Sequence, residues 1–69
     1  MKTNKEILRE YLDLAIQAEF TFEVIREVSA KGRSTDSYAK RLDELANSLE
    51  RYVSSYPWII EVFKVKELE

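Results

Sequence analysis

The chain contains neither cysteine nor histidine, and it has one glycine and one proline in 69 residues. Disulfides cannot stabilise it, and zinc sites built from thiolate or imidazole ligands are excluded. A cysteine nucleophile and histidine acid–base chemistry are excluded for the same reason. A single glycine also rules out a glycine-rich phosphate loop. We therefore expect a protein without a metal, a cofactor or enzymatic activity.

Long apolar runs and a strong excess of charge of one sign are missing too. The longest unbroken apolar stretches, Leu14 to Ile16 and Trp58 to Ile60, have three residues, whereas a membrane-spanning helix needs about 20. Charged residues interrupt the N-terminal region, so we expect no signal peptide there. The 11 basic and 13 acidic side chains leave a net charge of −2, which favours neither a membrane surface nor a nucleic acid. We expect a cytoplasmic protein.

What the chain does have is apolar and charged side chains in quantity, 45% and 35% of all residues. Its length predicts a single domain over residues 1–69. A domain of this size buries only about 60% of the surface that the unfolded chain exposes, and such domains often depend on a metal, disulfides or a partner subunit. With the first two excluded, the sequence favours association with a partner.

The lone glycine and the lone proline divide the chain into three segments. Thr3 followed by Glu6 predicts a capping box at a helix start, and Lys31 followed by Gly32 suits a helix end. We therefore expect helices over about 4–31 and 35–55, with a short third helix over about 57–67. The first two would form an antiparallel hairpin, and self-association would complete an all-α bundle.

The second segment carries a heptad seam of apolar and aromatic residues. The seam predicts the face that packs on the first helix. Its members are Tyr38, Leu42, Leu45, Leu49, Tyr52 and Tyr56.

The first segment has apolar residues on two faces. At 100° per residue, one face would meet the second helix. That face contains Ile7, Leu8, Tyr11, Leu14, Ala15, Ala18, Phe22 and Ile25. A second ridge lies opposite, formed by Leu12, Ile16, Phe20 and Val24. One partner helix cannot bury both faces, so something else is expected to cover the ridge.

The third segment is one candidate for that cover, and a second copy of the chain is the other. Its residues 58–66 are also good strand formers, but a lone strand has no partner in a helical chain, so we favour a helix. Trp58 either anchors this segment in the core or belongs with the ridge at a protein interface. The sequence leaves these alternatives open.

Two clusters of charge suggest other chemistry. Glu19, Glu23 and Glu27 form an acidic row that we interpret as solvated, since helical carboxylate metal sites also use histidine. Four basic residues gather near the expected turn, namely Lys31, Arg33, Lys40 and Arg41. They predict a possible phosphate or nucleic-acid contact, which the net negative charge disfavours.

Parts of the chain resemble two families of small helical regulators. Between Val24 and Tyr52 it resembles the sporulation-stage aspartyl-phosphate phosphatases, helical hairpins whose Ser-Gln-Glu-Leu-Asp motif is matched here by Leu42 and Asp43 alone. The run Arg41 to Leu45 with a later tryptophan is similar to the haemolysin-expression modulators, which are small nucleoid-associated partners. Each resemblance covers less than half of the chain, so no family is assigned. The first resemblance implies a third hypothesis, an enzyme acting on phosphorylated proteins.

The sequence therefore predicts a small, non-enzymatic helical protein for protein–protein interaction or regulation. It would act as a homodimer or by sequestering a partner protein, through Leu12, Ile16, Phe20, Val24 and Trp58. A nucleic-acid-associated regulator that uses the basic hairpin end is the alternative.

Overall fold

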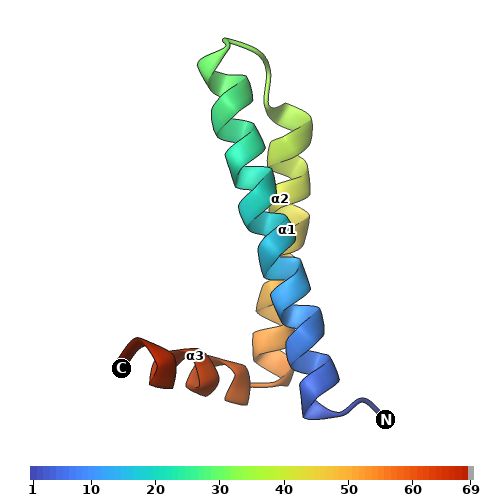
Figure 1. Ribbon diagram of the computed structural model, residues 1–69. Helices are drawn as coiled ribbons and strands as arrows, with labels where there is room; N and C mark the ends of the chain where they lie inside the picture. Colours follow the sequence, from blue (N-terminus) through green and yellow to red (C-terminus); the bar gives the residue numbers. More distant parts are fainter. Residues whose placement is uncertain (69) are drawn as a thin grey trace.

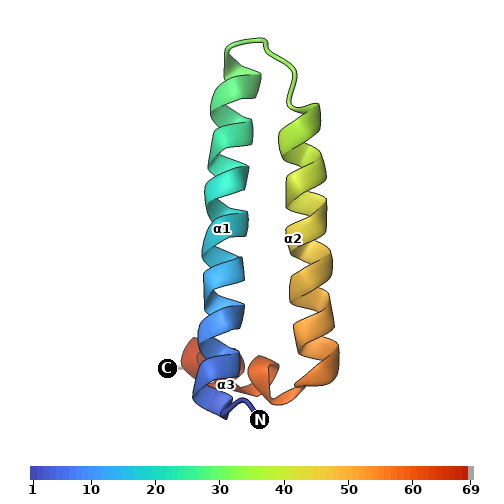
Figure 2. The same cartoon turned by 90° about the vertical axis from the view of Figure 1, so that its right-hand side faces the viewer.

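The computed structural model describes the backbone of residues 1–68 and the side chains of residues 1–63. It contains three helices, α1 (Asn4–Ala30), α2 (Asp36–Ser55) and α3 (Trp58–Leu68), and no strand over these residues. α1 and α2 run side by side in opposite directions, and α3 leaves the plane of this hairpin at its lower end (Figures 1 and 2). The expected all-α hairpin with a short C-terminal helix is confirmed.

Local hydrogen bonds explain where α1 begins and ends. The Thr3 hydroxyl oxygen accepts a 3.2 Å hydrogen bond from the backbone N–H of Glu6 and donates one of 3.1 Å to its carboxylate. At the other end Gly32 has a φ of 74°, a conformation that glycine adopts at little cost. The backbone N–H of Gly32 bonds to the carbonyl of Ser29, and that of Arg33 bonds to the carbonyl of Val28. This pair of bonds is a Schellman motif, which reverses the chain towards α2.

The hairpin core lies between α1 and the seam of α2. Leu45, near the middle of α2, is only 3% exposed and Ile7 of α1 only 4%. The other seam residues of α2 are half-buried except Tyr38, which lies next to the turn and is 41% exposed. The heptad pattern of the second helix therefore identified its buried face correctly.

The inner face of α1 departs from the expected one at Phe22. Thr21 is buried at 9% exposure, whereas Phe22 is 51% exposed. The Thr21 hydroxyl donates a 2.8 Å hydrogen bond to the Gln17 carbonyl, so its burial leaves no polar group unpaired. One row of buried and half-buried residues on this face of α1 then follows a four–three spacing. They are Ile7, Tyr11, Leu14, Ala18, Thr21, Ile25 and Val28.

A corner at Pro57 separates α3 from α2. Ile59, in the first turn of α3, is completely buried, and its backbone N–H bonds to the Tyr56 carbonyl at 3.0 Å. The ring centroids of Phe63 and Tyr11 are 5.7 Å apart, which places α3 against the N-terminal half of α1. Ile59 and Phe63 therefore dock this helix onto the lower end of the hairpin.

The molecule is elongated for its mass. Its extents are 43 × 31 × 16 Å, and its radius of gyration is 14.5 Å against about 11 Å for a compact domain of this length. It exposes 5787 Å², whereas a compact monomer of 8.2 kDa exposes about 4,500 Å². The folded chain thus presents about 1,300 Å² more surface than its mass requires.

Over residues 1–68 the chain has no helix whose length and apolar content would suit a membrane span.

Candidate interaction surface

The apolar ridge expected on the first helix lies on the outer surface of α1. Leu12 is 40% exposed, Ile16 is 64% exposed and Phe20 is 70% exposed. Val24, the fourth expected member, is half-buried because it lies closer to α2. Three large apolar side chains thus stand one helical turn apart in solvent.

The described part of the chain does not cover this ridge. Figure 1 looks onto α1 with α2 behind it and α3 extending to one side at the lower end. α3 reaches Tyr11 through Phe63, while Ile16 and Phe20 stay exposed further along α1. The sequence left two candidates to cover the ridge, the third segment and a second copy of the chain. Over the described residues, the third segment does not cover it.

Trp58 lies apart from the ridge. It is half-buried at the corner of α2 and α3, with its ring centroid 6.4 Å from that of Tyr56. The Tyr56 ring in turn lies 6.2 Å from that of Tyr52. Trp58 therefore belongs to an aromatic row at the base of the hairpin, and the structure does not bring it together with Leu12, Ile16 or Phe20.

Charged residues continue the exposed ridge at both ends. Lys5 and Arg9 precede it on α1, and Glu23 and Glu27 follow it. All seven side chains are exposed, and together they form one line along the helix, called the outer stripe from here on. Its members in order are Lys5, Arg9, Leu12, Ile16, Phe20, Glu23 and Glu27.

The outer stripe borders a shallow, mostly apolar depression. Leu8, Leu12 and Ile16 form its apolar part, and Lys5 and Arg9 are among the charged residues that line it. A depression with an apolar floor and a charged rim is typical of a site that receives one large apolar side chain.

A polar cluster at the base of the hairpin ties α1 to α2. The Tyr52 hydroxyl donates a 2.5 Å hydrogen bond to Glu10 Oε1, and Lys2 Nζ lies 2.8 Å from the same oxygen. The hydrogen bonds from Lys2 and then Tyr52 lower the pKa of Glu10 below its ordinary 4.5. The hydrogen bond to Glu10 raises the pKa of Tyr52 above 10.0. Ionised Glu10 thus stabilises the hairpin base.

We expect Tyr52→Phe to lower the melting temperature at pH 7, because Glu10 then loses the hydroxyl donor on α2. Glu10 has its pKa lowered by folding, so its contribution is present above the unfolded-state pKa and is lost as the pH falls through the folded-state pKa. The difference between the variant and the wild type should therefore shrink below pH 4.5. Thermal melts followed by circular dichroism between pH 7 and about pH 2 test this. A difference that stays constant over this range would show that the ionised carboxylate plays no part.

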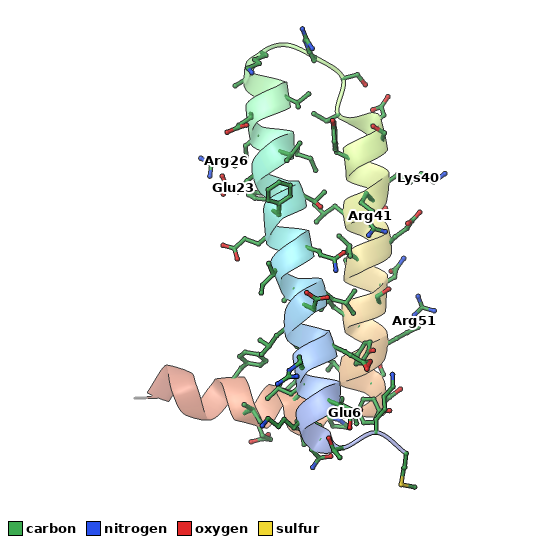
Figure 3. The ribbon with its side chains drawn as sticks, turned by 45° about the vertical axis from the view of Figure 1, so that its right-hand side comes forward. Glu6, Glu23, Arg26, Lys40, Arg41 and Arg51 are labelled. Carbon is green, nitrogen blue, oxygen red and sulfur yellow. The ribbon has the colours of Figure 1, made fainter. Side chains whose placement is uncertain are left out.

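The acidic row of α1, formed by Glu19, Glu23 and Glu27, is exposed. Within residues 1–63 no three acidic side chains converge closely enough to hold a metal ion. Glu23 instead lies 3.5 Å from Arg26, and both side chains are more than half exposed (Figure 3). Such an exposed pair contributes little to stability. Glu23 is therefore available to another cation.

The four basic residues near the turn are all exposed but differ in their surroundings. Lys31 and Arg33 flank Gly32, while Lys40 points away from the hairpin in Figure 3. Arg41 lies 3.8 Å from Glu44 and donates a 3.2 Å hydrogen bond to the Gln17 side-chain oxygen. Arg41 is thus engaged within the chain, across the two helices.

The sequence reasoning missed the basic part of the outer stripe, although a signal was present. Lys5 and Arg9 lie four residues apart, as do Glu23 and Glu27, and both pairs share the helical face of Ile16. The position of these charged pairs on the face of Ile16 indicates an interaction surface only because the ridge between them is exposed in the structure.

No known protein-family model matches the chain, and neither a curated protein nor a solved structure is significantly similar to it.

Proposed function

We propose that this chain is a non-enzymatic helical interaction protein that binds another polypeptide chain along the outer stripe of α1. The observation that carries the proposal is the exposure of Leu12, Ile16 and Phe20 on a single helical face. The protein would then regulate its partner by sequestering it, because a partner bound at this face is not available to other proteins. No chemical step is required.

Covering this face would contribute favourable free energy to binding. Burying a Leu, Ile or Phe side chain contributes about 1.5–3 kcal/mol each. The three side chains follow one i, i+4 ridge, which is the geometry that packs into the grooves of another helix. Charged residues at the ends of the ridge would favour one orientation of the partner over the other.

We expect Phe20→Glu to abolish binding, because it places a carboxylate in the middle of the buried patch. Multi-angle light scattering coupled to gel filtration reports self-association of the wild type and the variant. A second measurement immobilises both proteins and compares what each retains from an extract of the source organism.

Phe22→Glu is the matched control. It makes the same chemical change on a different side of α1, at a residue that is 51% exposed but lies outside the outer stripe. It should leave both readouts unchanged, and circular dichroism should show equal helicity for all three proteins. If Phe20→Glu changed neither self-association nor retention, the proposal would be wrong.

We propose that the protein is located in the cytoplasm, as the sequence predicts. Fluorescence microscopy of the tagged full chain in its source cells tests that location.

A further inference from the structure

We propose that the chain bound at the outer stripe is a second copy of this protein, paired antiparallel with Ile16 of both copies at the twofold axis. The inference rests on the proposed function and adds the identity of the partner and the register.

The spacing of the outer stripe is the same from either end. Its steps are four, three, four, four, three and four residues, with Ile16 at the centre. On an α-helix these steps keep all seven side chains within about 40° of one line, over about 33 Å. A twofold axis at Ile16 therefore sets every member of the stripe level with a member of the partner's stripe, and each pair occurs twice, as in an isologous interface.

The charges of the outer stripe select the antiparallel orientation. Lys5 and Arg9 lie on the N-terminal side of Ile16, and Glu23 and Glu27 lie on its C-terminal side. Antiparallel pairing sets Lys5 level with the partner's Glu27, and Arg9 level with the partner's Glu23. Parallel pairing would set each charge beside its own copy, which repels. Within residues 1–63, Lys5, Arg9 and Glu27 form no ion pair, so they are available to a second chain.

The same register matches the apolar shapes. It sets Phe20 level with the partner's Leu12, beside the depression formed by Leu8, Leu12 and Ile16. Phe20 is the most exposed aromatic side chain among the described residues, at 70%. Each copy thus offers one aromatic side chain and one depression, and antiparallel pairing fills both.

The exposed area also fits a second copy. The chain exposes about 1,300 Å² more than a compact monomer of its mass, and a stable interface buries about 800 Å² per partner. Two copies joined along α1 would form a layer of four helices with the two α1 helices in the middle, since each α2 lies on the opposite side of its own α1.

Cross-linking tests the register directly, because the chain has no cysteine and every introduced thiol is unique. Under oxidising conditions I16C alone should give a disulfide-linked dimer, since only residue 16 lies opposite its own copy. R9C alone and E23C alone should not cross-link. Their mixture should give a 9–23 heterodimer, identified on a non-reducing gel by an added tag on one of the two chains.

Charge reversal tests the same pairing at equilibrium. R9E changes two symmetric ion pairs into repulsions, and we expect the dimer dissociation constant to rise about tenfold in sedimentation equilibrium. R9E/E23R restores opposite charges and should return the constant to within about threefold of the wild type. R51E is the matched control, because Arg51 lies on α2, away from the outer face of α1 (Figure 3). It should leave the constant unchanged.

Each outcome separates the inference from the proposed function. Self-cross-linking of R9C would mean parallel pairing, which overturns the register while leaving a self-associating protein. A wild type that stays monomeric up to its solubility limit overturns the second copy as partner, and the retention experiment with Phe20→Glu then decides the proposed function. A dimer that Phe20→Glu leaves intact would overturn pairing of two copies along the outer stripe, and the retention experiment would again decide the proposed function.

Discussion

Ile59→Ala should lower the free energy of unfolding by about 2–5 kcal/mol, the usual cost of emptying a fully buried isoleucine site. Ile59 has no exposed surface and lies in the first turn of α3, where the chain leaves α2. α3 has 11 residues and would be marginal by itself, so its order depends on this docking. A domain of this length has about 3–10 kcal/mol of stability in total, so the loss is a large fraction.

The measurement is chemical denaturation followed by circular dichroism and by Trp58 fluorescence, at one fixed protein concentration. The fluorescence of Trp58, next in sequence to Ile59, should shift to longer wavelength in the variant as the corner loosens. Ile60→Ala is the matched control, because it deletes the same atoms from a neighbouring side chain that is 49% exposed. Equal losses in the two variants would contradict the assignment of Ile59 as the anchor of α3.

Leu45→Ala should destabilise the hairpin itself by about 2–5 kcal/mol. Leu45 is 3% exposed at the middle of the α2 seam, where α1 and α2 pack together. Alanine keeps the helix propensity high, so the loss reports packing between the two helices rather than formation of α2. Because the whole hairpin depends on this contact, we expect one cooperative transition at lower denaturant concentration.

Leu42→Ala provides the graded comparison, since Leu42 belongs to the same seam but is only half-buried. Its loss of unfolding free energy should be smaller than that of Leu45→Ala. A larger loss for Leu42 would mean that the core lies nearer the turn than the structure places it.

Local interactions made most of the fold predictable. The capping box at Thr3 and the turn at Gly32 depend on residues within a few positions of one another, so the sequence contains all the information needed. The same holds for the seam around Leu45, whose spacing is a property of one helix. Helix ends agreed with the prediction to within about one residue, the usual difference between ways of assigning them.

The burial of Thr21 in place of the expected Phe22 shows that hydrophobicity alone can predict the wrong buried residue. A purely apolar reading selects Phe22, yet the four–three spacing set by Leu14 and Ala18 places residue 21 at the interface. The Thr21 hydroxyl is satisfied within its own helix, so burial costs little and geometry decides.

The candidate site was predictable in part. Leu12, Ile16 and Phe20 were expected outside the hairpin contact and lie there, because an i, i+4 row faces one direction on any straight helix. Trp58 was expected in the core or with this ridge. It is half-buried at the corner beside Tyr56 of the seam, apart from the ridge, and its neighbour Ile59 takes the fully buried position.

The absence of cysteine and histidine, the three helices and the exposed apolar ridge were determined by the sequence alone, since each follows from composition or from periodicity within one segment. Only the tertiary structure decided the direction of α3. That direction depends on Ile59 and on the packing of Phe63 against Tyr11, which are distant in sequence and carry no local signal. Because α3 docks at the base of the hairpin, the outer stripe stays exposed. This exposure, which depends on the packing of all three helices, is the basis for the proposed pairing with a second copy.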